Sequence, residues 1–408
     1  MSLREIDYIY LKPKFQQMNY LLILWPFLFT WHSVEPQFEI QEIDNNVAIG
    51  YGIVIGDVDG DGKPDILLAD KNEFVWYRNG DWKRFVMIEN LTEYDNVCIA
   101  ARDINGDGKV EIVVGAQWNP GETSDKEKSG TVHYLVRPED PTQKWKAVEL
   151  YHEPTVHRMR WAKTSNGEHH LIMVPLHGIG NKGGEGNGVN IIAYKPPKDW
   201  TGEWNYQIVP TEMHMTHNLE IVDFGKGEGE SVLIGGKEGI KVFTFQNNQW
   251  QPSSKGEWLV KNQSFGELRM GQLTPDRWML GGIEPIHGNM VTAYLSSNSN
   301  FKMEHLSRLV LDDKIKEGHG ILIADFLNQG RSQLVIGWRA KNDFGEMGIK
   351  MYYSENNNFT QTREFWIDKN GMSCEDLQMA DLDGDGKLDM IAAGRSTNNL
   401  RIYWNRSN

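Results

Sequence analysis

"DLDGDGKLD", residues 381–389, places four aspartates within nine positions, and the same spelling returns as "DVDGDGKPD" at residues 57–65 and "DINGDGKVE" at residues 103–111. Like charges at positions 1, 3, 5 and 9 repel one another unless a cation lies among them. The glycine at position 6 permits a sharp reversal, and a backbone carbonyl at position 7 can complete an oxygen shell. Such ligands suit a hard cation, so the three loops are predicted to bind calcium, with magnesium as the second choice.

The predicted calcium ligands occupy positions 1, 3, 5, 7 and 9 of each loop: Asp57, Asp59, Asp61, Lys63 and Asp65; Asp103, Asn105, Asp107, Lys109 and Glu111; Asp381, Asp383, Asp385, Lys387 and Asp389. About three ions are expected, and they are expected to be structural because each loop joins two strands of one sheet. A solvated hairpin turn is the alternative, but it does not account for the acid that all three loops share at position 9.

A longer repeat surrounds each acidic loop. The loop lies between two apolar runs, as in "GYGIVIGDVDGDGKPDILLAD", and degenerate copies such as "THNLEIVDFGKGEGESVLIGG" bring the total to seven units. The units recur at intervals of roughly 50 residues, and a third and often a fourth strand-like run follows each pair. Four strands per unit predict an all-β fold, a seven-bladed β-propeller with four-stranded blades.

The ends of the chain support a closed ring. The last unit stops after its third strand, and the run "FEIQEI" at residues 38–43 precedes the first unit. That N-terminal strand is predicted to complete the last blade, which would close the ring and remove an exposed edge. One propeller domain is therefore expected over residues 36–408. A linear solenoid is the alternative, but it leaves the missing strand unexplained.

Residues 1–35 are predicted to be a leader. The apolar run within "MNYLLILWPFLFTWHS", residues 18–33, is short for a bilayer span and fits a signal peptide that starts at Met18. Export to the periplasm or the medium is expected, with an uncleaved membrane anchor as the alternative. No later segment is apolar enough to cross a membrane, and the net charge of −14 argues against nucleic-acid binding. Cys98 and Cys374 could form a disulfide, but two buried thiols are favoured.

The strand ends opposite the acidic loops are predicted to meet at the mouth of the central channel. Two registered sets of residues fall there: Tyr51, Val97, His157, His217, Gly266, His319 and Glu375 before the first strands, and Gln117, Trp118, His177, His287, Trp338, Arg339 and Arg395 after the second strands. Neutral imidazoles converge readily on zinc or a similar ion. The best predicted ligands are His157, His217 and His319, with Glu375, His177 or His287 as further candidates, although any one of these histidines alone could be structural.

Other side chains at the mouth are predicted to bind substrate. Arg158, Arg160 and Arg339 suit a carboxylate or a hydroxyl-rich ligand, with salt bridges between blades as the alternative. Tyr51, Trp118 and Trp338 could stack on sugar rings. A carbohydrate is therefore the expected partner.

The acidic loops resemble the FG-GAP or VCBS repeat of secreted propellers. The stretch "HRMRW", with His157 and Arg160, and "GHG" around His319 resemble the propeller domain of the aldos-2-ulose (anhydrofructose) dehydratases. This resemblance implies a metal-dependent carbon–oxygen lyase that acts on a keto sugar or an oxidised glycoside by β-elimination, with a metal in the channel. Under it, His177 or His287 is the predicted base, and Arg160 and Arg339 assist.

A non-catalytic carbohydrate- or protein-binding FG-GAP propeller is the alternative function. It predicts no transition metal and contacts spread over Trp118, Trp338 and residues 178–188. Hydrolysis by paired carboxylates is less well supported, because only Glu375 with Asp376, or Glu284, falls near the mouth.

Overall fold

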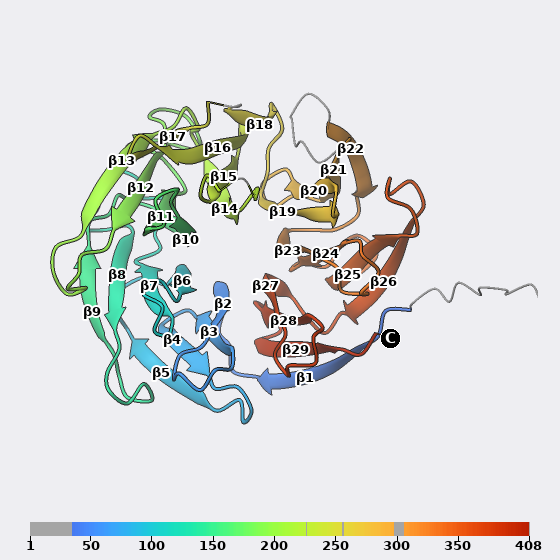
Figure 1. Cartoon of the computed structure of the whole chain (residues 1–408), viewed down its shortest axis with the longest axis horizontal. Coiled ribbons are helices and arrows are strands. Elements are labelled where there is room, and N and C mark those ends of the chain that lie inside the picture. The colour runs from blue at the N-terminus through green and yellow to red at the C-terminus, as the bar shows by residue number, and fades with distance from the viewer. Residues whose placement is uncertain (1–34, 226, 255–256, 298–305, 408) are drawn as a thin grey trace, which may run out of the picture. The chain divides into compact units, whose positions relative to one another are not determined.

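The computed structural model describes residues 35–225, 227–254, 257–297 and 306–407. The predicted leader lies outside these residues apart from Glu35. Residues Glu35–Asn408 form one compact unit. Seven antiparallel sheets surround a central axis, and no helix occurs in the described residues (Figure 1). The predicted seven-bladed β-propeller is confirmed.

The strands of each sheet are given from the axis outward. The first three sheets contain β2 (Gly52–Gly56), β3 (Asp65–Ala69), β4 (Glu73–Tyr77) and β5 (Arg84–Glu89); β6 (Cys98–Arg102), β7 (Glu111–Ala116), β8 (Thr131–Val136) and β9 (Lys146–Leu150); and β10 (Val156–Lys163), β11 (His169–Pro175), β12 (Asn190–Lys195) and β13 (Asn205–Pro210). The next two contain β14 (Thr216–Val222), β15 (Ser231–Gly236), β16 (Gly239–Gln246), β17 (Gln249–Pro252) and β18 (Trp258–Lys261); and β19 (Glu267–Thr274), β20 (Arg277–Glu284), β21 (Met290–Ser296) and β22 (Leu306–Asp312). The last two contain β23 (Gly318–Ala324), β24 (Gln333–Trp338), β25 (Gly348–Ser354) and β26 (Thr362–Lys369); and β27 (Cys374–Ala380), β28 (Asp389–Gly394), β29 (Asn399–Asn405) and β1 (Phe38–Asp44).

Burial falls from the second strand of a blade to its outer strand. Every residue of β3, β7, β15, β24 and β28 is buried, because both faces of each sheet pack against neighbouring blades. The outer strands β1 and β13 are mostly exposed. This gradient explains why the second strands read as continuous apolar runs while the outer strands carry polar residues.

The N-terminal strand closes the ring as predicted. β1 pairs antiparallel with β29 from Phe38 opposite Asn405 to Asp44 opposite Leu400. Arg401 on β29 forms an ion pair with Glu42 on β1 at 2.9 Å. The pairing joins the two ends of the propeller within one blade and covers an edge that would otherwise be free. In the fourth sheet the outer position is divided between β17 and β18, which both pair with β16.

The hydrophobic core lies mainly between blades. One cluster combines Val113 and Val132 of the second blade with Met159 and Leu171 of the third. Cys98 belongs to this cluster, and burial raises the pKa of its thiol to about 12. Cys98 and Cys374 are both free and buried, so the alternative of a disulfide between them is excluded.

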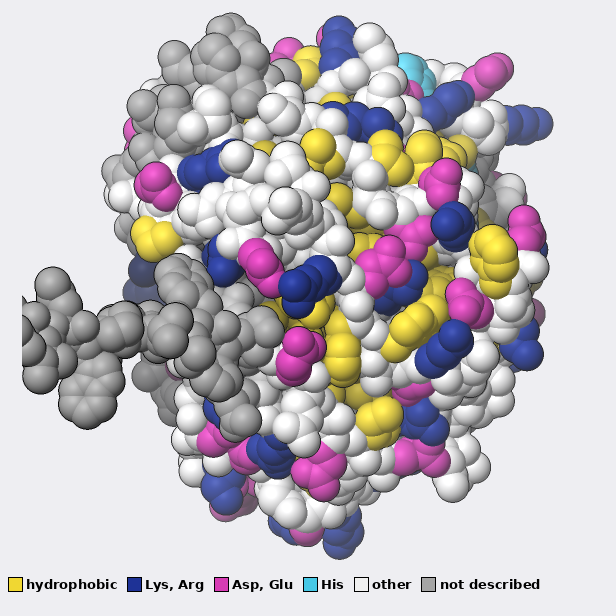
Figure 2. Space-filling view, turned by 90° about the vertical axis from the view of Figure 1, so that its right-hand side faces the viewer, with side chains coloured by type: hydrophobic (Ala, Val, Ile, Leu, Met, Phe, Trp, Pro, Cys, Tyr) yellow, Lys and Arg dark blue, Asp and Glu magenta, His cyan; other side chains and the backbone are white. Residues whose placement is uncertain are grey.

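Charges of opposite sign alternate on the side of the ring that carries β26. There Arg363 pairs with Glu355 at 2.6 Å and Lys369 with Glu346 at 2.8 Å. The space-filling view onto that side shows Lys and Arg interspersed with Asp and Glu (Figure 2). In the part of the chain that the structure describes, no helix is suited to crossing a bilayer.

Candidate functional site

The mouth residues lie where the antiparallel register predicts. The start of each inner strand faces the end of the second strand, as where Val156 pairs with Pro175 and Gly318 pairs with Trp338. The acidic loops close the other end of the same strand pairs. The two registered sets of residues therefore share one face of the ring.

Four inner strands carry an irregularity at the mouth. The register shifts between Val156 and Arg158, between Thr216 and Asn218, between Gly318 and Gly320, and between Cys374 and Asp376. The residue inside each shift is His157, His217, His319 or Glu375, the four residues predicted as ligands. A bulge re-aims a side chain and is frequent beside functional sites. The backbone of these blades thus departs from a regular ladder at the predicted site.

Three histidines from three blades form a cluster. His217, His287 and His319 each offer one ring nitrogen, and these nitrogens all lie within 4.8 Å of one another. The Nε2 atoms of His217 and His287 are 2.8 Å apart. The rings of His287 and His319 are stacked with centroids 5.2 Å apart. This histidine cluster is the candidate metal centre.

Backbone carbonyls hold two of the three rings. His217 Nδ1 lies 2.8 Å from the carbonyl oxygen of Gly266, and His319 Nδ1 lies 2.6 Å from that of Glu375. A carbonyl oxygen only accepts, so each Nδ1 carries the proton and each Nε2 has a lone pair, which in His217 faces Nε2 of His287. Metal-binding histidines are typically oriented by such a bond from the other ring nitrogen.

His287 reaches the cluster from an irregular segment. Its φ is 50°, a left-handed conformation that is unusual for a residue other than glycine and is often found at functional sites. A Cβ added at Gly266 would lie 2.9 Å from the backbone nitrogen of His287, so a side chain at that position would push the segment away. The carbonyl oxygen of Gly266 therefore accepts from the His217 ring, and the absence of a side chain at Gly266 leaves room for the backbone of His287.

Burial keeps the imidazoles neutral. It lowers the pKa of His157 and His319 well below the usual value and lowers the pKa of His287 to about 3. Positive charge on Arg158 and on neighbouring histidines adds to this effect. Neutral imidazoles are the form that binds metal ions.

The remaining predicted ligands have other partners. His157 stacks on Trp118 with centroids 5.0 Å apart and meets His217 edge to face at 4.8 Å, beside the cluster. The carboxylate of Glu375 accepts from Arg339 at 2.8 and 3.0 Å and from Arg395 at 2.8 Å. His287, which was predicted as a base or a further ligand, shares the cluster with His217 and His319.

The predicted substrate and base residues are spread over the mouth. Tyr51 donates to Asp95 at 2.9 Å and lies under the guanidinium of Arg395. Arg158 and Arg160 line a narrow cavity of about 20 Å³ together with Tyr51. The backbone N–H of His177 donates to the hydroxyl oxygen of Thr155 at 3.0 Å, and its ring makes no contact with the rings of the histidine cluster among the described residues.

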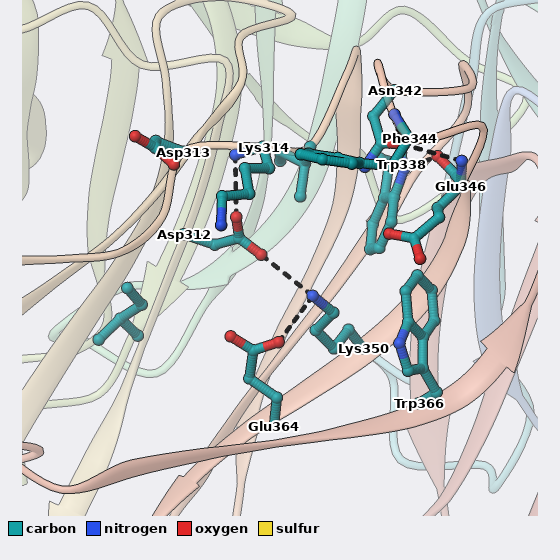
Figure 3. Close-up of a pocket in the computed structure, with 12 residues that line it drawn as sticks. Asp312, Asp313, Lys314, Trp338, Asn342, Phe344, Glu346, Lys350, Glu364 and Trp366 are labelled. Atoms are coloured by element: carbon teal, nitrogen blue, oxygen red, sulfur yellow. Dashed lines mark hydrogen bonds and ion pairs between the residues drawn. The ribbon is translucent and has the colours of Figure 1, made fainter.

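Trp338 lines a different pocket. This pocket, about 400 Å³, lies between β22 and the sheet of β24 to β26 (Figure 3). Lys350 occupies its centre and donates to Asp312 at 3.1 Å and Glu364 at 2.8 Å. The Lys350 ammonium also lies over the Trp338 and Trp366 rings. The polar groups at its centre thus pair with one another, and Trp338 itself is buried.

Sequence reasoning missed Glu267. Its Oε1 has no hydrogen-bond partner in the described structure and lies 3.4 Å from His217 Nδ1 and 4.0 Å from His319 Nδ1. A carboxylate behind two ligand histidines increases their basicity. Glu267 directly follows Gly266 in the registered mouth set, and that adjacency could have identified it.

The acidic loops gather their carboxylates as predicted, with one exception. In the first loop Asp57, Asp59 and Asp61 offer oxygens within 4.8 Å of one another, and the last loop does the same with Asp381, Asp383 and Asp385. The acid at position 9 is buried instead and accepts backbone N–H groups, as Asp65 does from Val58 and Asn79. Burial raises the pKa of Asp65 and Glu111 to about 7 and that of Asp389 to about 6. Position 9 thus fastens the loop to its blade.

Comparisons with known proteins agree with this fold. The family model described as aldos-2-ulose dehydratase, beta-propeller domain, matches residues 129–297. The FG-GAP-like repeat matches residues 51–114 and 325–392, and the FG-GAP repeat matches residues 99–135. These matches confirm both resemblances noted in the sequence and associate the chain with a carbohydrate-related propeller domain. No curated protein matches this sequence.

Solved structures with a similar fold belong to proteins with different functions. A chain of the mitotic checkpoint complex shares 10% identity and a TM-score of 0.54 over 99% of both chains. The exotype rhamnogalacturonan lyase YesX shares 15% identity and a TM-score of 0.50, with 90% of this chain and 74% of that chain covered. At these identities the likenesses show the fold alone.

Proposed function

We propose that this propeller is an exported, metal-dependent carbon–oxygen lyase that acts on a keto sugar or an oxidised glycoside by β-elimination at the channel mouth. One observation carries the proposal: three imidazoles from three blades present ring nitrogens within 4.8 Å of one another. The match to the dehydratase propeller domain over residues 129–297 supports the carbohydrate and lyase parts.

The donor set of the histidine cluster fits zinc. Three nitrogen ligands with an open fourth position are typical of catalytic zinc sites. The bonds from Nδ1 to Gly266 and Glu375 leave Nε2 of His217 and His319 on the cluster side, where an ion would replace the contact between Nε2 of His217 and Nε2 of His287. When bound there, a zinc-like ion would supply Lewis acidity toward a substrate oxygen. The three acidic loops are proposed to hold structural calcium.

The chain's own residues have complementary roles. His157 lies beside His217, and because its imidazole stays neutral, a ring nitrogen can accept the proton that the elimination releases. Trp118 holds that ring by stacking. Glu375 fixes Arg339 and Arg395 at the rim, where the two guanidinium groups can orient oxygen atoms of a sugar.

A non-catalytic carbohydrate-binding propeller is the second candidate. The 2.8 Å contact between Nε2 of His217 and Nε2 of His287 favours it, since one shared proton would satisfy both nitrogens without any metal. The two candidates differ in metal content.

Elemental analysis of the purified full-length protein tests the proposal. The lyase predicts about three equivalents of calcium and one of zinc or a similar ion, and it predicts that His217→Ala removes the latter while leaving calcium in place. His214→Ala is the matched control, because His214 is partly exposed and pairs with Glu238 outside the cluster. Protein that carries calcium alone, and that produces no unsaturated sugar from any keto sugar, would support the binding module instead.

A further inference from the structure

Arg158 is a guanidinium at the mouth without an acidic partner. Its one hydrogen bond in the described residues goes to the carbonyl oxygen of His157 at 3.2 Å, and no described carboxylate lies within ion-pair distance. Three arginines around the channel are paired, since Arg339 and Arg395 hold Glu375 and Arg269 holds Glu220, whereas Arg160 resembles Arg158 in having no ion pair among the described residues. Arg158 therefore has donors left for a ligand.

Two carboxylates line the same cavity without pairing with Arg158. Asp376 accepts from the backbone nitrogens of Ile53 at 2.7 Å and Leu377 at 2.8 Å. Glu267 accepts from the side chain of Asn218. Neither acid forms an ion pair with Arg158 among the described residues, so its guanidinium donors stay available within the lining that it shares with both acids.

Arg158 also lies close to the histidine cluster. Its guanidinium donates to the carbonyl oxygen of His157, and the His157 ring lies 4.8 Å from the ring of His217. The cavity beside it is only about 20 Å³, which leaves room for about one water molecule. A sugar carboxylate that pairs with Arg158 must therefore approach it from outside this cavity.

A partly buried guanidinium costs free energy unless its donors are satisfied, and its planar fork matches the two oxygens of a carboxylate. We propose that Arg158 binds the carboxylate of a sugar acid, so that the substrate class of this mouth is the uronic acids and their glycosides. The inference rests on the proposed function and narrows its substrate.

The elimination then balances without an oxidant or a reductant. The hydrogen on the carbon next to the carboxylate leaves as a proton to a ring nitrogen of His157. Its electron pair forms the carbon–carbon double bond while the bond from the neighbouring carbon to its hydroxyl or glycosidic oxygen breaks. The leaving oxygen takes up a proton, and the products are an unsaturated sugar acid and water or an alcohol. When the carboxylate pairs with Arg158, the negative charge that develops on the carbon next to it costs less free energy.

Calorimetric binding to the full-length, metal-replete protein tests the inference with matched ligands: D-glucuronate against D-glucose, and D-galacturonate against D-galactose. At least one acid should bind about tenfold or more tightly than its neutral partner, because hydrogen bonds to charged groups are the strong ones. The preference should shrink at high salt. The inference is overturned if neither acid is preferred, including the case in which no acid binds.

Variants distinguish binding of the carboxylate by Arg158 from attraction by the overall charge of the protein. Arg158→Met should abolish the preference for the acid while neutral sugars and zinc bind as before, and Arg158→Lys should keep only part of it. Arg363→Met is the control, since Arg363 lies on the outer strand β26 and should change nothing. The inference is overturned if Arg158→Met still prefers the acid. If Arg158→Met does not fold, the inference is overturned when Arg158→Lys keeps the full preference. Elimination from neutral keto sugars without any preference for acids would leave the proposed function standing and remove this inference alone.

Discussion

The two ends of the inner strands carry opposite kinds of ionisable group. At one end, three acidic loops present carboxylates such as Asp57, Asp59 and Asp61 that lie within a few residues of one another and are partly exposed. At the other end, His217, His287 and His319 are distant in the chain, and His217 and His319 are buried. An ion in a loop would tie together two strands of one blade, whereas an ion at the mouth would join three blades.

This difference predicts a division of labour. The loop sites lie at the opposite end of the inner strands from the mouth residues, so their ions should affect stability. The mouth combines neutral imidazoles, arginines and a narrow cavity, so it should affect chemistry. Variants at the two ends should therefore change different measurements.

His319→Ala should give the largest effect. Losing one of three ligands should remove several kcal/mol of transition-state stabilisation, which is about a thousandfold in kcat/KM. Formation of the unsaturated product, followed by its ultraviolet absorbance, checks this, with His214→Ala as the control. The unfolding midpoint should change little, and full activity in His319→Ala would contradict the division of labour.

Glu375→Gln should affect stability while zinc stays bound. The carboxylate pairs with Arg339 and Arg395, and removing it from a buried ion pair costs about 3 kcal/mol. The carbonyl oxygen that holds His319 is unchanged by this substitution. Urea unfolding and zinc analysis on the same preparation check the prediction, and loss of zinc would show that Glu375 is a ligand.

The fold was predictable because its evidence is local and repeated. Each blade contains its own loop and its own fully buried second strand, so seven copies of one pattern give the ring, and the position of β1 follows from the missing outer strand. The mouth was predictable in part, since the registered positions identified His217 and His319. The place of His287 depends on a left-handed backbone and on the close approach that Gly266 permits, and neither has a sequence pattern. Whether Glu375 faces a metal or two arginines depends on contacts between blades.

Calcium should increase the free energy of unfolding only by binding to the acidic loops. At a hundredfold excess over its dissociation constant, one bound ion adds about 2.7 kcal/mol to the free energy of unfolding. Asp59→Asn should lose much of this gain. Asp223→Asn is the matched control: Asp223 accepts from Gly225 as Asp59 does from Asp61, but it lies in a degenerate loop that is predicted to bind no ion. Thermal unfolding with calcium and with chelator checks the prediction, and equal calcium responses in both variants would contradict it.

Buried histidines away from the mouth should give the smallest effect, a dependence of stability on pH. Burial lowers the pKa of His133 to about 4, whereas in the unfolded chain the imidazole has its usual pKa of about 6.5. Between these values the unfolded state holds more protons, so stability is fully present above the unfolded pKa and is lost as the pH falls through this window, by at most about 1.4 kcal/mol per pH unit for one group. His133→Gln should reduce that slope when urea unfolding is followed between pH 7 and 4 in chelator, without changing turnover at pH 7. If the dependence of the unfolding free energy on pH is unchanged in His133→Gln, other groups, the mouth histidines among them, take up the protons. Lowering the pH would then act on the mouth as well, and acid could not distinguish the two ends of the strands.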